Sequence, residues 1–136
     1  MNTHRIRILA GLGSLILLAT GLFHMTAYPL VQAASEAIDA DFLRQAIQAS
    51  WVAPSVHWLF IAFLAYGLAA YKSKIAAAML IGFGAMALTD AMLIFWHVGL
   101  FTGGIMLTAS ALCYLTAGFM LRREMYALLK AEVENS

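Results

Sequence analysis

The chain has 136 residues, of which 63% are hydrophobic and only 11% are charged. A water-soluble domain is about 45–50% apolar and about 25% charged, so this composition excludes an ordinary soluble fold and predicts one membrane domain over residues 1–136. The formal net charge of +1 argues against nucleic acid as a partner, and a single cysteine, Cys113, excludes an internal disulfide and any site built from several thiolates.

Four long apolar runs predict four transmembrane helices, because each approaches the roughly 20 residues that cross a bilayer and only helices or closed barrels satisfy their backbone there. We expect the spans at residues 6–28, 56–71, 75–97 and 105–121. The fold class is therefore an all-α antiparallel four-helix bundle. The tight turn at residues 72–74 makes the second and third spans antiparallel neighbours, and the spacing of Ala78 and Gly82 is typical of close helix packing.

The first run needs separate consideration, because Arg5 and Arg7 followed by the apolar residues 8–23 resemble a cleavable secretory signal. The segment that follows is long for a cleavage region and contains Pro29, so we expect the first span to be retained. Pro29 also provides a natural stop for this helix.

Residues 32–50 are expected outside the membrane, between the first and second spans. Asp41 can cap a short helix with Phe42, Ala46 and Ile47 on one face, which is the pattern of a helix lying in the membrane interface. The alternative is a single kinked helix that runs from Asp41 into the second span. After the fourth span, residues 122–136 are expected to form a charged helical tail.

Positive charge is concentrated at one side of the predicted membrane. Seven of the eight Lys and Arg residues, all except Arg44, fall in three clusters beside the spans: Arg5, Arg7, Lys72, Lys74, Arg122, Arg123 and Lys130. The positive-inside rule then places both termini in the cytoplasm. The expected location is a bacterial inner membrane, with the lipid bilayer as the first partner.

Four ionisable residues remain at membrane depth: His24, His57, Asp90 and His97. The three histidines fall near the outer ends of three different spans, and Asp90 lies about 10 Å deeper than His97 on the same helical face. A carboxylate at this depth costs about 2.5–3.5 kcal/mol, so we expect it to be protonated, bound to a cation, or hydrogen-bonded by Thr20 or His24. An ordinary packing role for Asp90, and a headgroup-level position for each histidine beside Trp51, Trp58 or Trp96, stay open.

Taken together, these residues predict a ligand site in the outer leaflet. His24, His57 and His97 are candidate cofactor ligands for haem b, with an apolar slot supplied by Phe23, Phe60, Phe95, Met25 and Met92. The same histidines with Asp90 are candidate ligands for a transition metal, and a quinone-like headgroup is the third possibility. No HExxH or CxxC motif accompanies them.

Three functions follow from this pattern. The favoured one is a binding or electron-transfer module of the membrane. The alternatives are a structural or assembly subunit, paired with another membrane protein or with copies of itself, and a small transporter or proton relay that uses Asp90. The relay is less favoured because the inner halves of the spans lack polar residues. An enzyme is also less favoured, because Ser110 and Cys113 have no assigned base.

Overall fold

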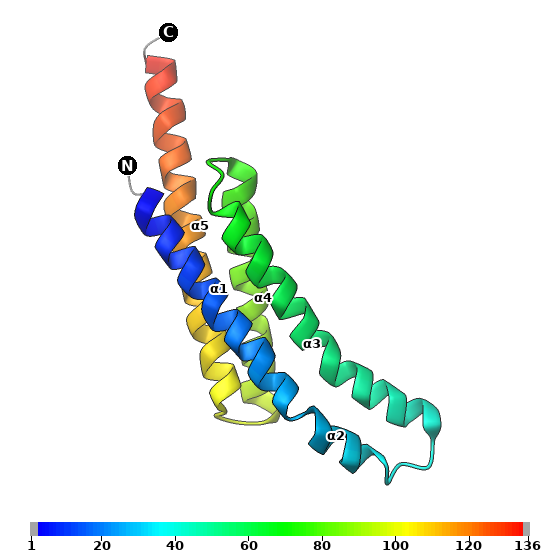
Figure 1. Cartoon of the computed structure of the whole chain (residues 1–136). Helices are drawn as coiled ribbons and strands as arrows, with labels where there is room; N and C mark the ends of the chain where they lie inside the picture. The colour runs from blue at the N-terminus through cyan, green and yellow to red at the C-terminus, as the bar shows by residue number, and fades with distance from the viewer. Residues whose placement is uncertain (1–2, 135–136) are drawn as a thin grey trace.

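The computed structural model describes residues 3–134, which form five α-helices (Figure 1). The helices are α1 (Thr3–Thr26), α2 (Tyr28–Ser35), α3 (Asp41–Leu68), α4 (Lys74–His97) and α5 (Thr102–Glu134). No strand occurs among these described residues. The all-α fold class predicted from the sequence is therefore confirmed.

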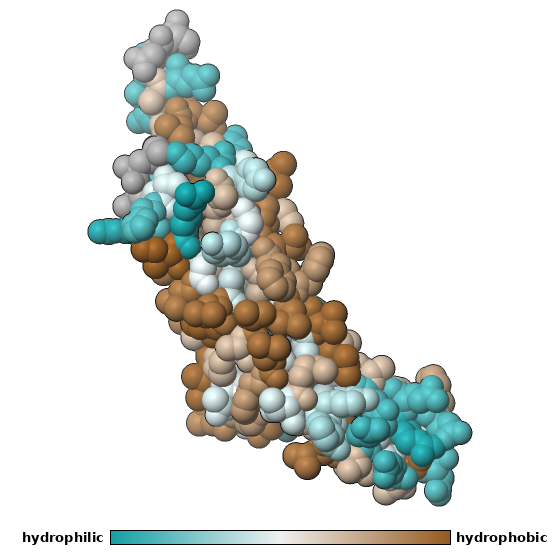
Figure 2. Space-filling model, in the orientation of Figure 1, coloured by the Kyte–Doolittle hydropathy of each residue, from teal (hydrophilic) through white to brown (hydrophobic). Residues whose placement is uncertain are grey.

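Four helical segments within the described range are long and apolar enough to cross a membrane. They are Thr3–Ser35 (α1 with α2), Asp41–Leu68, Lys74–His97 and Thr102–Glu134. Figure 2 shows a hydrophobic band across the middle of the molecule, with hydrophilic residues gathered toward its two ends. These features indicate an integral, multi-pass membrane protein. The beginning of α1, the turn between α3 and α4, and the end of α5 lie toward the same end of the bundle (Figure 1).

Helix α5 is central to the packing, because it lies against both α1 and α4, whereas α3 packs mainly against α1. Two glycines allow α4 and α5 to approach closely. A Cβ at Gly84 would lie 2.7 Å from Cγ of Leu115, and a Cβ at Gly118 would lie 2.7 Å from Cγ1 of Ile81. Small residues serve this purpose in membrane bundles, since dispersion contacts between close helices replace the hydrophobic effect.

The glycine expected to make a close helix contact does not make one. A Cβ at Gly82 would meet nothing within 4 Å, and Ala78 is exposed. Both residues have the right spacing, but the face of α4 that they share meets no neighbouring atom at Gly82, and at Ala78 it borders a hollow between α4 and α5. The direction of that face depends on the packing and cannot be read from the spacing.

Buried polar groups join α1 to α5. The hydroxyl of Ser110 donates to the carbonyl of Gly13 at 2.9 Å, and the hydroxyl of Tyr114 donates to Oγ of Ser14 at 3.1 Å. Ser110 and Tyr114 are both 0% exposed. These two hydrogen bonds between α1 and α5 were not predicted from the sequence, which drew attention only to the ionisable residues of the spans.

The second predicted span is longer than expected. Residues 41–50, predicted as a separate interfacial helix, are instead the first part of α3, so the structure adopts the continuous-helix alternative. Pro54 lies inside α3, where it has no N–H to donate to the carbonyl four residues earlier. The separate short helix is α2, and Pro29 is accommodated in its first turn, where N–H groups lack helical partners anyway.

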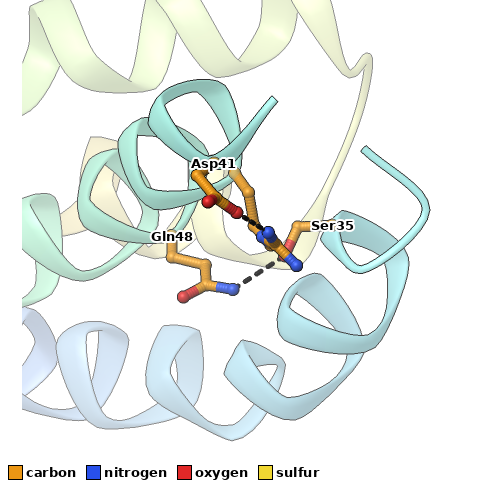
Figure 3. Close-up of polar contacts among 4 residues, drawn as sticks. Ser35, Asp41 and Gln48 are labelled. Atoms are coloured by element: carbon orange, nitrogen blue, oxygen red, sulfur yellow. Dashed lines mark hydrogen bonds and ion pairs between the residues drawn. The ribbon is translucent and has the colours of Figure 1, made fainter. Parts of the chain in front are cut away.

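Side-chain contacts hold α2 against the beginning of α3 (Figure 3). The amide of Gln48 donates to Oγ of Ser35 at 2.8 Å, and the Ser35 hydroxyl donates to the carbonyl of Gln32 at 2.8 Å. Arg44, the one cation outside the three basic clusters, forms an ion pair with Asp41. This end of the molecule is therefore polar and lies far from the basic end (Figure 2).

Candidate functional site

Three helices bring five side chains together into what we call the aromatic–carboxylate cluster. Its members are His24 from α1, Trp51, Ser55 and Trp58 from α3, and Asp90 from α4. Positions 51, 55 and 58 are separated by four and three residues, so their side chains lie on one face of α3. Because α3 packs along α1, this face is directed at the last turns of α1.

His24 is held on three sides. Its Nδ1 lies 2.9 Å from Oγ of Ser55, which is itself 0% exposed. Its ring stacks on the indole of Trp51, with ring centroids 4.1 Å apart and planes 14° from parallel. The Trp51 indole nitrogen donates in turn to the His24 carbonyl at 3.2 Å. The imidazole is therefore fixed in orientation by a hydrogen-bonding partner and an aromatic face.

Trp58 connects the histidine to the carboxylate. Its indole meets the His24 ring edge-on, at 5.3 Å between centroids and 73° between planes. Its Nε1 donates to Oδ2 of Asp90 at 2.8 Å. Trp58 is only 3% exposed, so this hydrogen bond lies inside the bundle while Asp90 itself is half-buried.

The partner of Asp90 differs from both candidates named from the sequence. The hydroxyl of Thr20 donates to the carbonyl of Ile16 in its own helix at 2.8 Å, and the His24 ring has Ser55 as its hydrogen-bond partner. An indole N–H satisfies one carboxylate oxygen without supplying a charge. Trp58 was expected at the membrane interface because of its residue type, and nothing in the local sequence distinguishes it from Trp96, which is 85% exposed.

The other two histidines lie outside this cluster. His57 points from α3 into a shallow hollow lined by residues of that helix, including Ala53 and Phe60, and its Nε2 is buried without a hydrogen-bond partner among the described residues. His97 is exposed at the end of α4. In the described part of the chain, no group of three or more His, Cys, Asp or Glu side chains is arranged to hold a metal ion. The structure thus associates His24 with Asp90 and leaves His57 and His97 apart from them.

Three side chains of the expected haem slot also point away from the interior. Phe23, Phe60 and Met92 are 46%, 64% and 64% exposed. They are therefore on the outer surface of the bundle, where lipid would cover them. The assignment of the histidines as haem or metal ligands stays a prediction.

Trp51 and Ser55 were not among the predicted ligand-site residues, because Trp51 was expected at the membrane interface and Ser55 lay just before the expected start of the second span. The signal that could have found them is their shared helical face with Trp58, which places two indoles and a hydroxyl at one interface. That signal required α3 to be continuous through Pro54, whereas the expected boundary at residue 56 separated Trp51 and Ser55 from Trp58.

The fold and the cluster define a multi-pass membrane protein with a buried contact chain between a histidine and a carboxylate. A comparison with known protein families, curated proteins and solved structures finds no match to this chain.

Proposed function

We propose that this chain is a binding module of the membrane whose aromatic–carboxylate cluster receives a small, planar, quinone-like headgroup. The observation that carries the proposal is the connection of His24 to Asp90 through Trp58, across three helices at membrane depth. An ionisable residue inside a bilayer is by default a functional candidate, because its burial is costly. Here two ionisable residues, His24 and Asp90, both contact Trp58.

The chemistry of the cluster matches such a headgroup. A carboxylate has about four acceptor positions, of which Trp58 uses one, so Asp90 has capacity to accept from a quinol hydroxyl. An imidazole N–H can donate to a quinone carbonyl. The stacked pair of His24 and Trp51 supports the proposal, because a planar headgroup could stack on the same aromatic rings. His24 and Asp90 are only half-buried, which leaves each side chain accessible from the membrane.

The test is saturable quenching of tryptophan fluorescence by a short-chain benzoquinone and, in a separate titration under reducing conditions, by its quinol, each added to the purified full chain in detergent micelles. A Trp96→Phe background removes the exposed indole, so that Trp51 and Trp58 report on the cluster. We expect Asp90→Asn to weaken binding of the quinol roughly tenfold or more, since the hydrogen bond from the quinol hydroxyl to the carboxylate is lost. Asn still accepts from Trp58, so the bundle contact is retained.

His24→Phe is the second test variant, because it keeps a ring against Trp51 and removes both nitrogens. His97→Ala is the matched control, since it removes an exposed imidazole outside the cluster. Equal, non-saturable quenching in all variants would reflect quinone dissolved in the micelle and would overturn the proposal. A Soret band or stoichiometric metal that is lost in His24→Phe would replace the quinone with haem or a metal ion.

The second candidate is an assembly subunit, which is favoured by the end of α5. Residues 122–134 continue the helix beyond the other helices (Figure 1), and Tyr126, Leu128 and Val133 are 56%, 50% and 74% exposed. A partner chain or a second copy could cover this segment. Cross-linking in native membranes, followed by purification, should then give a product of fixed stoichiometry that is lost when Leu128 and Val133 are both replaced by Asp.

A further inference from the structure

At the basic end of the bundle, α4 and α5 enclose a hollow of about 340 Å³. Its rim carries Lys74, the first residue of α4, together with Arg122 and Tyr126 of α5. Deeper toward the membrane it is lined by Ala77, Ala78 and Ile81. The hollow thus has a cationic mouth and an apolar floor.

The two cations of the mouth converge on one aromatic ring. Nζ of Lys74 lies 5.9 Å and Cζ of Arg122 lies 5.7 Å from the centroid of the Tyr126 ring. Both distances fall within the about 6 Å range of a cation–π contact, which holds the charges in place without neutralising them. Neither cation forms an ion pair with an acidic side chain in the described part of the chain. The mouth therefore brings two positive charges together at one place on the basic end of the bundle.

The floor continues as an apolar track along α4. Ala78 is exposed, and the position of a Cβ at Gly82, one turn further into the membrane, is open space. The small residues at these two positions, four apart on one face of α4, leave the surface beside the charged mouth open to an acyl chain of the bilayer.

We propose that this hollow binds one anionic phospholipid of the surrounding bilayer, with its phosphate between Lys74 and Arg122 and an acyl chain along Ala78 and Gly82. Charge complementarity at the mouth selects a net negative headgroup over a zwitterionic one, since basic pockets between transmembrane helices favour anionic lipids. The Tyr126 hydroxyl is available as an additional donor to the phosphate. The site is independent of the aromatic–carboxylate cluster, which lies toward the other end of α4.

The experiment is native mass spectrometry of the full chain in detergent, titrated with dioleoyl phosphatidylglycerol or dioleoyl phosphatidylcholine. We expect one phosphatidylglycerol to bind more tightly than phosphatidylcholine. The double variant Lys74→Gln/Arg122→Gln should weaken phosphatidylglycerol binding roughly thirtyfold, because two surface cations near the headgroup are removed. The exchange Lys74→Arg/Arg122→Lys keeps both charges and should retain preferential binding.

The matched control is Arg5→Gln/Arg123→Gln, which makes the same change in net charge at the same end of the bundle outside the hollow. It should bind phosphatidylglycerol as the wild type does. An equal loss of phosphatidylglycerol affinity in both double variants would mean that the lipid is attracted by the overall positive charge of this end of the bundle. That result would overturn the proposed site. Displacement of the lipid by soluble glycerol 3-phosphate at equal concentration would overturn the role of the acyl track. Circular dichroism of each variant verifies that the helices are intact.

Discussion

The indole nitrogen of Trp58 donates a hydrogen bond to Oδ2 of Asp90 at 2.8 Å, and this contact joins α3 to α4. The relationship matters for the fold because α3 packs mainly against α1 and touches α4 over a much smaller surface. A polar contact at a sparse interface fixes how two helices are aligned. The same hydrogen bond also orients the carboxylate that we place in the ligand site.

Replacing Trp58 by Phe should destabilise the protein by about 1–3 kcal/mol, because a half-buried carboxylate then loses its donor. The measurement is the free energy of unfolding in mixed micelles, followed by circular dichroism. Trp96→Phe is the control, because Trp96 is 85% exposed and should change stability by less than about 0.5 kcal/mol.

A double-mutant cycle with Asp90→Ala isolates the pair from the general loss of packing. We expect a coupling free energy of about 0.5–1.7 kcal/mol, the range found for hydrogen bonds between membrane helices. Simple additivity of the two single substitutions would contradict the contact between α3 and α4.

Gly84 and Gly82 provide a matched pair on one helix. Gly84→Ala should destabilise the protein by about 1–3 kcal/mol, because its Cβ would lie 2.7 Å from Leu115 and 3.0 Å from the carbonyl oxygen of Ala111. Gly82→Ala introduces the same methyl group into open space and should be neutral or stabilising by up to about 1 kcal/mol through helix propensity. Both values come from the same unfolding assay. If the two variants were equally stable, the close approach of α4 and α5 would be wrong.

The hydroxyl of Ser110 offers a test of the contact between α1 and α5. Ser110→Ala should cost about 0.5–1.5 kcal/mol, since the carbonyl of Gly13 loses a buried donor. Thr116→Ala is a suitable control on the same helix, because Thr116 is exposed. An unchanged melting temperature for Ser110→Ala, measured in the same detergent, would show that the Gly13 carbonyl does not depend on this donor.

Much of the fold could be predicted because the physical signal is local. A run of about 20 apolar residues needs no tertiary information to indicate a membrane-spanning helix. Helix boundaries were harder to predict. The second span was expected to begin at residue 56, yet α3 begins at Asp41, and the helical tail expected after residue 121 is the uninterrupted continuation of α5 to Glu134. Helical propensity extends a helix past its apolar part, and sequence hydropathy does not report that extension.

The candidate site was predictable only in part. Asp90 and His24 stand out because ionisable residues are costly inside a bilayer, and the structure places them in one chain of contacts. Trp58, which lies between them, belongs to a residue type that is common at membrane interfaces, so its position alone did not reveal its role. His57 and His97 carry the same local signal as His24, yet they face other surroundings.

By itself the sequence determined that the protein lies in a lipid bilayer, that it is all-α, and which residues are unusually polar for that environment. These features follow from the length of each apolar run and the position of each charge, which are local properties of the sequence. Tertiary structure decided which of those residues meet. The direction of a side chain around a helix axis has meaning only relative to a neighbouring helix. Close packing at Gly84 and Gly118 sets α4 against α5, packing at Gly21 sets α1 against α3, and in this arrangement Trp58 of α3 reaches Asp90 of α4.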